Sequence, residues 1–255
     1  MIFTQLIQTN LRTKELGKYI EYYNRLDSTN AEAWDLIKDG SRHGTVVITD
    51  NQTKGKGRRD NLWVMIAGKG LTFSLIIEKQ YPNTYAGLIS LATGLSVVKS
   101  LNKRGVEAKL KWPNDIFAGE KKLGGILCET KIVKNKIEII VIGVGINVNE
   151  KISEHPENIR DHLTTMFEIS DHAHQRELIV AEFINSIERL LYELSDKPEQ
   201  IIDKWLNHCL HLNEKISFHE NTKIIEGVFC GLDINGFAKI EVNNKIKTYG
   251  SINLI

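Results

Sequence analysis

The sequence predicts an α+β fold, in which a β-sheet packs against helices and is followed by a small β-barrel at the C-terminus. Short apolar segments rich in β-branched residues predict the sheet, and longer runs with apolar residues three and four positions apart predict the helices. After Leu212 the pattern changes to short alternating segments separated by turn residues. A chain of 255 residues, 42% of them hydrophobic, is long enough to bury one large core and a smaller one.

The predicted core strands lie at residues 45–49, 71–77 and 137–142, where valine, isoleucine and leucine dominate. After Pro82, leucine and valine recur at helical spacing with small residues between them, which predicts a closely packed helix. A second amphipathic run covers residues 178–194, and a shorter one follows Pro198. The polar stretch at 150–161 is interpreted as a loop.

The C-terminal tail alternates apolar and polar residues at 215–218, 223–230, 238–242 and 245–249. Asp-Ile-Asn-Gly at 233–236 and Asn-Asn at 243–244 are typical of turns between such strands. We therefore predict two domains, at residues 1–211 and 212–255.

The charges nearly cancel, because 33 basic and 32 acidic side chains leave a net charge of +1. Such a chain has no overall field that favours nucleic acid or membranes. Cys128, Cys209 and Cys230 lack the Cys-x-x-Cys spacing of zinc or redox sites, so free thiols in a reducing cytosol are expected. We see no basic segment followed by a long apolar run, and no stretch near the roughly eighteen apolar residues of a membrane span. The sequence thus favours a cytoplasmic protein without membrane contact.

The segment Lys-Gly-Lys-Gly-Arg-Arg at residues 54–59 places four cations within six residues. Its glycines let the backbone approach a ligand, and arginine can bind a carboxylate or phosphate with two parallel hydrogen bonds. The segment could therefore bind anions. A solvated basic turn or a nucleic-acid contact is the alternative.

A second unusual block is Lys-Trp-Pro-Asn-Asp at residues 111–115, followed by Lys-Leu-Gly-Gly-Ile-Leu at 122–127. Proline with asparagine and aspartate predicts a rigid turn whose side chains could bind ribose or a phosphate-bound metal. A plain hairpin with solvated lysines is the alternative.

The segment Gly-Val-Gly-Ile-Asn-Val at residues 143–148 superficially matches a dinucleotide-binding fingerprint. Val148 stands where the third glycine should be, so a strand with close backbone packing fits better. The chain contains no P-loop motif, and its eight histidines show no metal-ligand spacing.

These three blocks, together with Leu-Asp-Ser-Thr-Asn at residues 26–30, closely resemble the biotin protein ligase family. The resemblance covers about Tyr22 to Asn149 and implies a mixed sheet similar to the catalytic domain of class II aminoacyl-tRNA synthetases, plus a C-terminal SH3-like barrel. About twenty residues precede the match, so the form of the family without the N-terminal DNA-binding domain is expected.

The resemblance implies an ATP-dependent ligase that activates biotin as biotinyl-5′-AMP and transfers it to a lysine of a biotin carboxyl carrier protein or carboxylase domain. ATP and magnesium would be its cofactors. No specific DNA binding is expected, and a homodimer is compatible with the sequence. The alternatives are a lipoate ligase or octanoyl transferase of the same superfamily, or, from another class, a nucleic-acid-binding protein that uses residues 54–59.

The resemblance also implies the site residues. Those for biotin are Ser28, Thr29, Asn30, Gln52, Gly55, Lys56, Gly57, Arg58, Lys122, Gly124 and Gly125. Those for ATP are Arg58, Arg59, Trp63, Asn114, Asp115, Lys122 and Asn147. Lys122 and Arg58 would be the catalytic cations, and Asp115 would bind magnesium through the ATP phosphates. Family members commonly have arginine and glycine where this chain has Lys56 and Asp60, and a lysine lacks the two-pronged grip of arginine.

Overall fold

A computed structural model describes residues 1–220 and 223–254, apart from the side chains of Asp60 and Asn253. The helices are α1 (Thr4–Thr9), α2 (Thr29–Lys38), α3 (Ala86–Asn102), α4 (Met166–Ser170), α5 (Arg176–Asp196) and α6 (Pro198–Leu206). The larger sheet contains β1 (Ile20–Tyr23), β2 (Val46–Thr49), β5 (Leu71–Ile77), β6 (Tyr81–Pro82), β7 (Lys109–Lys111), β8 (Asp115–Ala118), β9 (Lys121–Val133) and β10 (Lys136–Ile146). The remaining strands are β3 (Gly55–Lys56), β4 (Leu62–Trp63), β11 (Lys215–Glu220), β12 (Lys223–Leu232), β13 (Ala238–Val242), β14 (Lys245–Tyr249) and β15 (Asn253–Leu254).

The larger sheet is mixed and has the order β1-β2-β5-β10-β9-β8-β7, with β6 paired to β10. Only β1 and β2 run parallel, and the other pairs are antiparallel. The long strands β9 and β10 form its centre, in a register that sets Cys128 opposite Ile142. The predicted α+β fold with a mixed sheet is confirmed.

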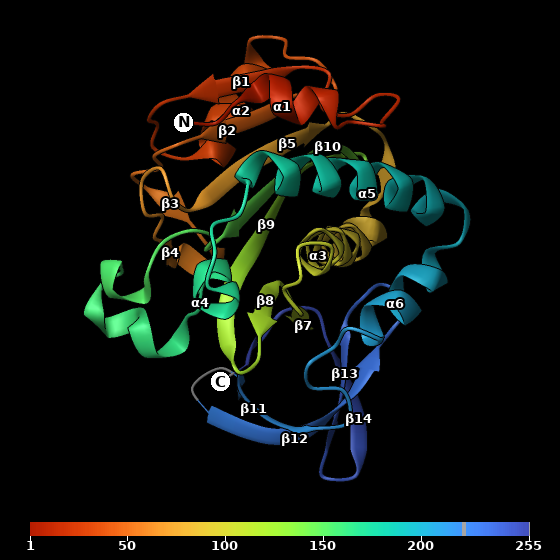
Figure 1. Ribbon diagram of the computed structural model, residues 1–255. Helices are drawn as coiled ribbons and strands as arrows, with labels where there is room; N and C mark the ends of the chain where they lie inside the picture. Colours follow the sequence, from red (N-terminus) through yellow and green to blue (C-terminus); the bar gives the residue numbers. More distant parts are fainter. Residues whose placement is uncertain (221–222, 255) are drawn as a thin grey trace.

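The two faces of this sheet are covered by different helices (Figure 1). Successive side chains of a strand point to opposite faces. In β2, Val46 and Ile48 join the large core that includes α3 and α5, whereas Val47 joins a small cluster beneath α2. That small cluster also holds Ile76 of β5 and Val141 of β10. Residues 74 and 143, two positions further along these strands, must therefore face the α2 side as well.

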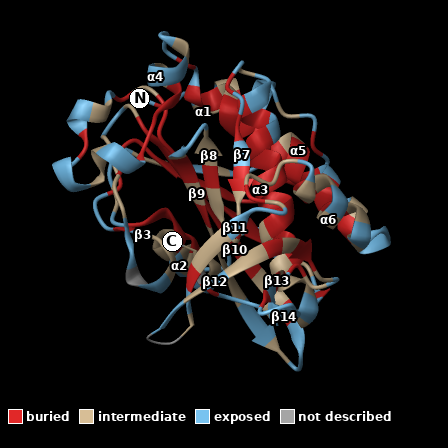
Figure 2. Ribbon diagram, turned by 90° about the horizontal axis from the view of Figure 1, so that it is seen from below, coloured by how far each residue is buried: buried red, intermediate tan, exposed pale blue. Residues whose placement is uncertain are grey.

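Helix α3 crosses the large core and packs against α5 and α6 (Figures 1 and 2). The segment Asn83–Asn102 is long and apolar enough to span a membrane by length and composition, so the sequence expectation that no stretch approaches such a span is wrong here. In the fold, 67% of its most apolar window is buried within the protein. Its apolarity is thus explained by its position between the sheet and two helices.

The C-terminal strands form an antiparallel sheet in the order β14-β13-β12-β11-β15, as the alternating pattern predicted. The predicted domain boundary at 211/212 falls in the connection between α6 and β11. The indole of Trp112 donates a hydrogen bond to the carbonyl of Gly236, in the turn before β13, over 3.1 Å. The stretch at 150–161, predicted as a loop, contains two short 3-10 helices, Ile152–Glu154 and Glu157–His162.

His211 is buried in the connection to the C-terminal sheet, where its ring packs edge-on against Phe229 with centroids 4.4 Å apart. Burial, assisted by the charge of Lys111, lowers the pKa of His211 to about 4. The folded protein therefore binds this proton more weakly than the unfolded chain does. The stability that His211 contributes is complete above about pH 6.5 and is lost as the pH falls toward 4.

We predict that the free energy of unfolding falls by about 3 kcal/mol more in the wild type than in His211→Leu between pH 6.5 and 4. Urea denaturation across this range measures both curves. If the two curves run parallel, His211 does not titrate with the fold.

Candidate functional site

The cavity of interest lies on the α2 side of the larger sheet and has a volume of 410 Å³. Beneath α2 this face is closed by Ile76 and Val141, but further along β10 only Gly143 and Gly145 follow on the same face. On β5, Ser74 is paired with Gly143 and Thr72 with Gly145, and Thr72 lines the cavity. Because this part of the face carries no bulky side chains, space remains there for the cavity.

The two glycines of β10 are required because other side chains lie directly over them. A Cβ atom at Gly143 would lie 2.3 Å from Oδ1 of Asn30, and one at Gly145 would lie 2.4 Å from the indole of Trp63. Both distances are far below van der Waals contact. The close backbone packing predicted for residues 143–148 is thus confirmed, and its partners are an amide and an aromatic ring of the cavity wall.

One end of the cavity is lined by neutral polar groups. Ser28 caps α2, since its hydroxyl accepts from the N–H of Ala31. The side-chain oxygen of Gln52 accepts from the N–H of Thr29 over 2.8 Å and lies 3.3 Å from the Thr29 hydroxyl. Ser28, Thr29, Asn30 and Gln52 are all buried. Ser28 thus both caps α2 and lines this end of the cavity.

The other end is lined by the cations Lys56, Arg58, Lys111 and Lys122 and by one carboxylate, Asp115. The ammonium of Lys122 lies 2.7 Å from Oδ1 of Asp115. Burial is the largest influence on Arg58 and on Lys111, and it lowers the pKa of both side chains. An anion bound at this end would offset the repulsion among these charges.

The Lys-Trp-Pro-Asn-Asp block forms the turn between β7 and β8 and joins three parts of the cavity wall. Trp112 is buried and contacts the C-terminal sheet through Gly236. The amide of Asn114 donates to the carbonyl of Ile126 on β9, and its oxygen accepts from Arg58 over 3.1 Å. Asp115 then begins β8, where it meets Lys122.

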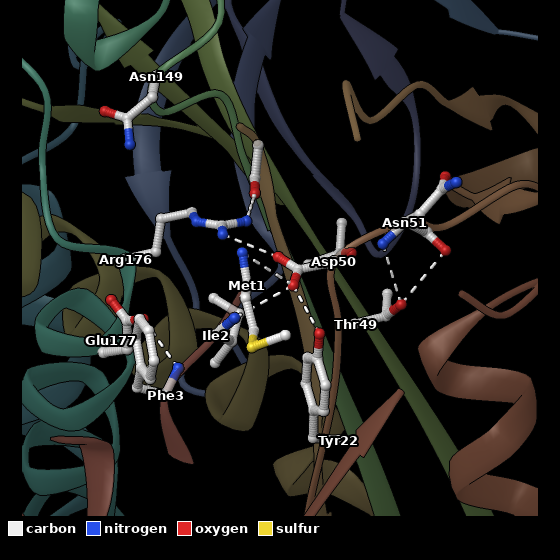
Figure 3. A network of polar contacts seen from close by, with 12 residues as sticks. Met1, Ile2, Phe3, Tyr22, Thr49, Asp50, Asn51, Asn149, Arg176 and Glu177 are labelled. Carbon is white, nitrogen blue, oxygen red and sulfur yellow. Dashed lines mark hydrogen bonds and ion pairs between the residues drawn. The ribbon is translucent and has the colours of Figure 1, made fainter. Parts of the chain in front are cut away.

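A buried charge network holds the chain just before Gln52 (Figure 3). The carboxylate of Asp50 accepts from the guanidinium of Arg176 over 2.8 Å and from the hydroxyl of Tyr22 over 2.7 Å. Arg176 also donates to the carbonyl of Gly70. The network ties the end of β2 to α5 and to the segment preceding β5, which fixes where Gln52 enters the cavity.

Most of the sequence-predicted site residues are brought together in the cavity wall. Those that line it are Ser28, Thr29, Asn30, Gln52, Lys56, Gly57, Arg58, Trp63, Asn114, Asp115, Lys122 and Gly125. The side chain of Asp60 lies outside the described residues.

Four predicted residues lie outside this lining. Gly55 packs against Trp63 and Gln52, and a Cβ at Gly124 would lie 2.6 Å from the carbonyl oxygen of Gly145. Arg59 contacts Ser251 instead. Asn147 is buried and donates to the carbonyl of Thr164, so its position does not support the predicted contact with ATP.

Several lining residues carry no signal in the sequence that predicts their place in the cavity. Lys111 was noted only as part of a motif, although it contributes one of the four cations. His219 of β11, Leu254 of β15 and Ile252, just before β15, also line the cavity. No local pattern marks these last three, because only the packing of the C-terminal sheet against the β7–β8 turn brings them to the cavity.

Comparison with known proteins gives a consistent result. Residues 22–147 match the model of the biotin/lipoate A/B protein ligase family. The chain is 26% identical over 245 residues to the bifunctional ligase/repressor BirA of Bacillus subtilis, covering 94% of this chain and 75% of that protein. It is 26% identical to the biotin–[acetyl-CoA-carboxylase] ligase of Mycobacterium tuberculosis, covering 83% and 80% of the two chains. The structure of the biotin protein ligase from Aquifex aeolicus in complex with biotin and ATP superposes with a TM-score of 0.79 at 30% identity, covering 93% and 99%.

We predict that Gly145→Ala lowers the free energy of unfolding by about 1–3 kcal/mol, because its methyl group would overlap the Trp63 indole. Gly125→Ala in the same cavity is the matched control, since the nearest atom lies 3.7 Å from its Cβ position. Urea denaturation compares the two variants. Equal losses would show that Trp63 does not pack on Gly145.

Proposed function

Because the chain belongs to the biotin protein ligase family, we propose that this cavity activates biotin with ATP and presents the product to a lysine of a carrier protein. The observation that carries the proposal is the division of the cavity into a neutral polar end and a cationic end. Biotin has the same division, because its ureido ring is neutral and both donates and accepts hydrogen bonds, whereas its carboxylate is an anion.

In this arrangement the ureido ring lies against Ser28, Thr29 and Gln52, and the carboxylate points toward Lys122 and Arg58. The carboxylate oxygen attacks the α-phosphorus of ATP, so that a C–O–P bond forms and the bond to the β-phosphate breaks with release of pyrophosphate. Both reactants are negatively charged and repel each other in solution. Fixed cations offset this repulsion and stabilise the charge that develops in the transition state.

In the second step the amine of the acceptor lysine attacks the activated carbonyl carbon, an amide bond forms, and AMP leaves. The mixed anhydride is already reactive, so positioning and exclusion of water contribute most. No nucleophile of the enzyme is needed. Cys128 points to the opposite face of the sheet, toward Thr93 of α3, and burial raises the pKa of its thiol to about 11.

Magnesium prefers oxygen ligands and usually reaches proteins together with nucleotide phosphates. Asp115 offers a carboxylate at the cationic end, and Asn114 also lines the cavity. Within the described residues, no group of three or more histidine, cysteine, aspartate or glutamate side chains could hold a metal alone. The donor set therefore fits an ion held by Asp115 and the ATP phosphates together, where it would neutralise phosphate charge.

A cytoplasmic location, a homodimer and the lack of specific DNA binding stay predictions from the sequence. A lipoate ligase is the alternative within the same family description.

We predict that exchange of labelled pyrophosphate into ATP requires biotin and is not supported by lipoate. The ureido group can use the donors and acceptors at the neutral end, whereas the dithiolane ring of lipoate would leave these buried groups unpaired. Equal exchange with the two acids would overturn the proposed substrate.

Lys122→Ala should lower biotinyl-adenylate formation by at least about a hundredfold, since losing one fixed charge contact in such a site costs roughly 3–4 kcal/mol of barrier. Lys121→Ala is the matched control, because Lys121 is exposed and its side chain points to the other face of β9. Mass spectrometry of the adenylate reports both variants. A Lys122 variant as active as its Lys121 counterpart would remove Lys122 from the catalytic residues.

The basic segment 54–59 should become protected from trypsin when biotin and ATP bind. Its contacts are a short β3–β4 hairpin, the exposed ion pair of Lys54 with Asp27, and hydrogen bonds from Arg58 to Asn114 and from Arg59 to Ser251. Exposed ion pairs of this kind contribute little, whereas a bound carboxylate and phosphate would satisfy several donors at once. Cleavage mapped by mass spectrometry, with and without the ligands, measures the change. The same cleavage rate in both states would contradict a role for Lys56 and Arg58 in closing over the ligand.

A further inference from the structure

Glu129 of β9 lies outside the lining of the cavity but contacts the helix that forms its neutral end. Glu129 is paired with Val141 of β10, so its side chain lies on the α2 face of the sheet. Its Oε2 atom accepts from Nδ2 of Asn30 over 2.7 Å and from the indole nitrogen of Trp34 over 3.3 Å. Asn30 and Trp34 are four residues apart and therefore share one face of α2.

The carboxylate determines which way the Asn30 amide is turned. An ionised carboxylate only accepts hydrogen bonds, so the group that faces Glu129 must be the NH2 of the amide. The carbonyl oxygen of Leu127, 3.3 Å from the same nitrogen, is also an acceptor and favours the same orientation of the amide. The amide oxygen of Asn30 is therefore left to face Ser74, whose hydroxyl lies 2.6 Å away.

The orientation of the Asn30 amide determines the hydrogen-bond role of Ser74 and, through Ser74, that of Thr29. A serine hydroxyl has one hydrogen, and the Asn30 oxygen can only accept it, so Ser74 donates to Asn30. The Thr29 hydroxyl lies 2.8 Å from the Ser74 hydroxyl and 3.3 Å from Oε1 of Gln52. With the Ser74 hydrogen engaged by Asn30, Thr29 donates its own hydrogen to one of these two oxygens. Thr29 accepts from neither neighbour, and the lone pairs of its hydroxyl remain free for an N–H group in the cavity.

We propose that Glu129 is a positioning residue for biotin: through Asn30 and Ser74 it fixes the Thr29 hydroxyl as an acceptor for a ureido N–H. This inference rests on the proposed function, since it assigns the ureido ring to the neutral end. A neutral glutamine at position 129 can turn its own NH2 toward Asn30, and that amide can then reverse at the cost of its longer contact with the Leu127 carbonyl, 3.3 Å. Ser74 would then donate to Thr29, and the ligand would lose one acceptor position.

The experiment measures biotin-dependent exchange of pyrophosphate into ATP with wild type, Glu129→Gln, Ser74→Ala and the double variant. Glu129→Gln should raise the KM for biotin about tenfold, the effect of one hydrogen bond of about 1.4 kcal/mol. The kcat and the KM for ATP should stay within about twofold, because the cationic end is unchanged. Adding Glu129→Gln to Ser74→Ala should raise the KM for biotin no further, since the path from Asn30 to Thr29 is already broken.

Trp34→Phe is the matched control, because it removes the other donor to Glu129 and leaves the contact with Asn30 in place. It should keep the KM of the wild type for biotin. An unchanged KM in Glu129→Gln, a loss confined to kcat, or effects of Glu129→Gln and Ser74→Ala that add in full would each overturn the inference. Absence of biotin-dependent exchange in the wild type would instead overturn the proposed function, so the two failures are distinguishable.

Discussion

The site depends on the lack of side chains at Gly143 and Gly145, two successive positions of β10 on the face beneath α2. Elsewhere on this face, Val47, Ile76 and Val141 fill the space between sheet and helix. A residue larger than glycine at either position would collide with Asn30 or Trp63. The backbone of the central strand is thereby brought close enough to form the floor of the cavity, while the opposite face of the same strand stays in the main core.

The chemistry follows from what surrounds that floor. At one end, buried hydroxyl and amide groups bond to one another and hold fixed donor and acceptor positions. At the other end, the lining includes four cations and one carboxylate, and burial lowers the pKa of Arg58 and Lys111. The repulsion among these cations is only partly offset by Asp115, so a bound anion stabilises this end of the site. The same cations can offset the repulsion between a carboxylate and a phosphate as they approach each other.

The C-terminal sheet takes part in the same site, although it is formed by the last forty or so residues of the chain. Trp112 reaches it through Gly236, and its neighbour Asn114 contacts Arg58. One turn, between β7 and β8, thus joins the C-terminal sheet, the basic segment and Lys122. Substitutions that disturb the packing of Trp112 are therefore expected to displace the residues at the cationic end of the cavity as well.

The sequence alone determined the α+β class and the C-terminal strands through local patterns, whereas the mixed sheet and most of the cavity lining were implied by the family resemblance. Apolar periodicity marked the strands and helices, and the blocks at 28–30, 52–58, 111–115 and 122–127 carried the family resemblance. Close packing at 143–148 also followed from the missing third glycine of a nucleotide fingerprint. The tertiary structure decided that Asn147 bonds to Thr164 away from the cavity and that His219 and Leu254 line it. It also revealed the path from Glu129 through Asn30 and Ser74 to Thr29. Contacts of this kind join residues that are distant in the chain, and their direction depends on which donor meets which acceptor, so no local pattern of residues can specify them.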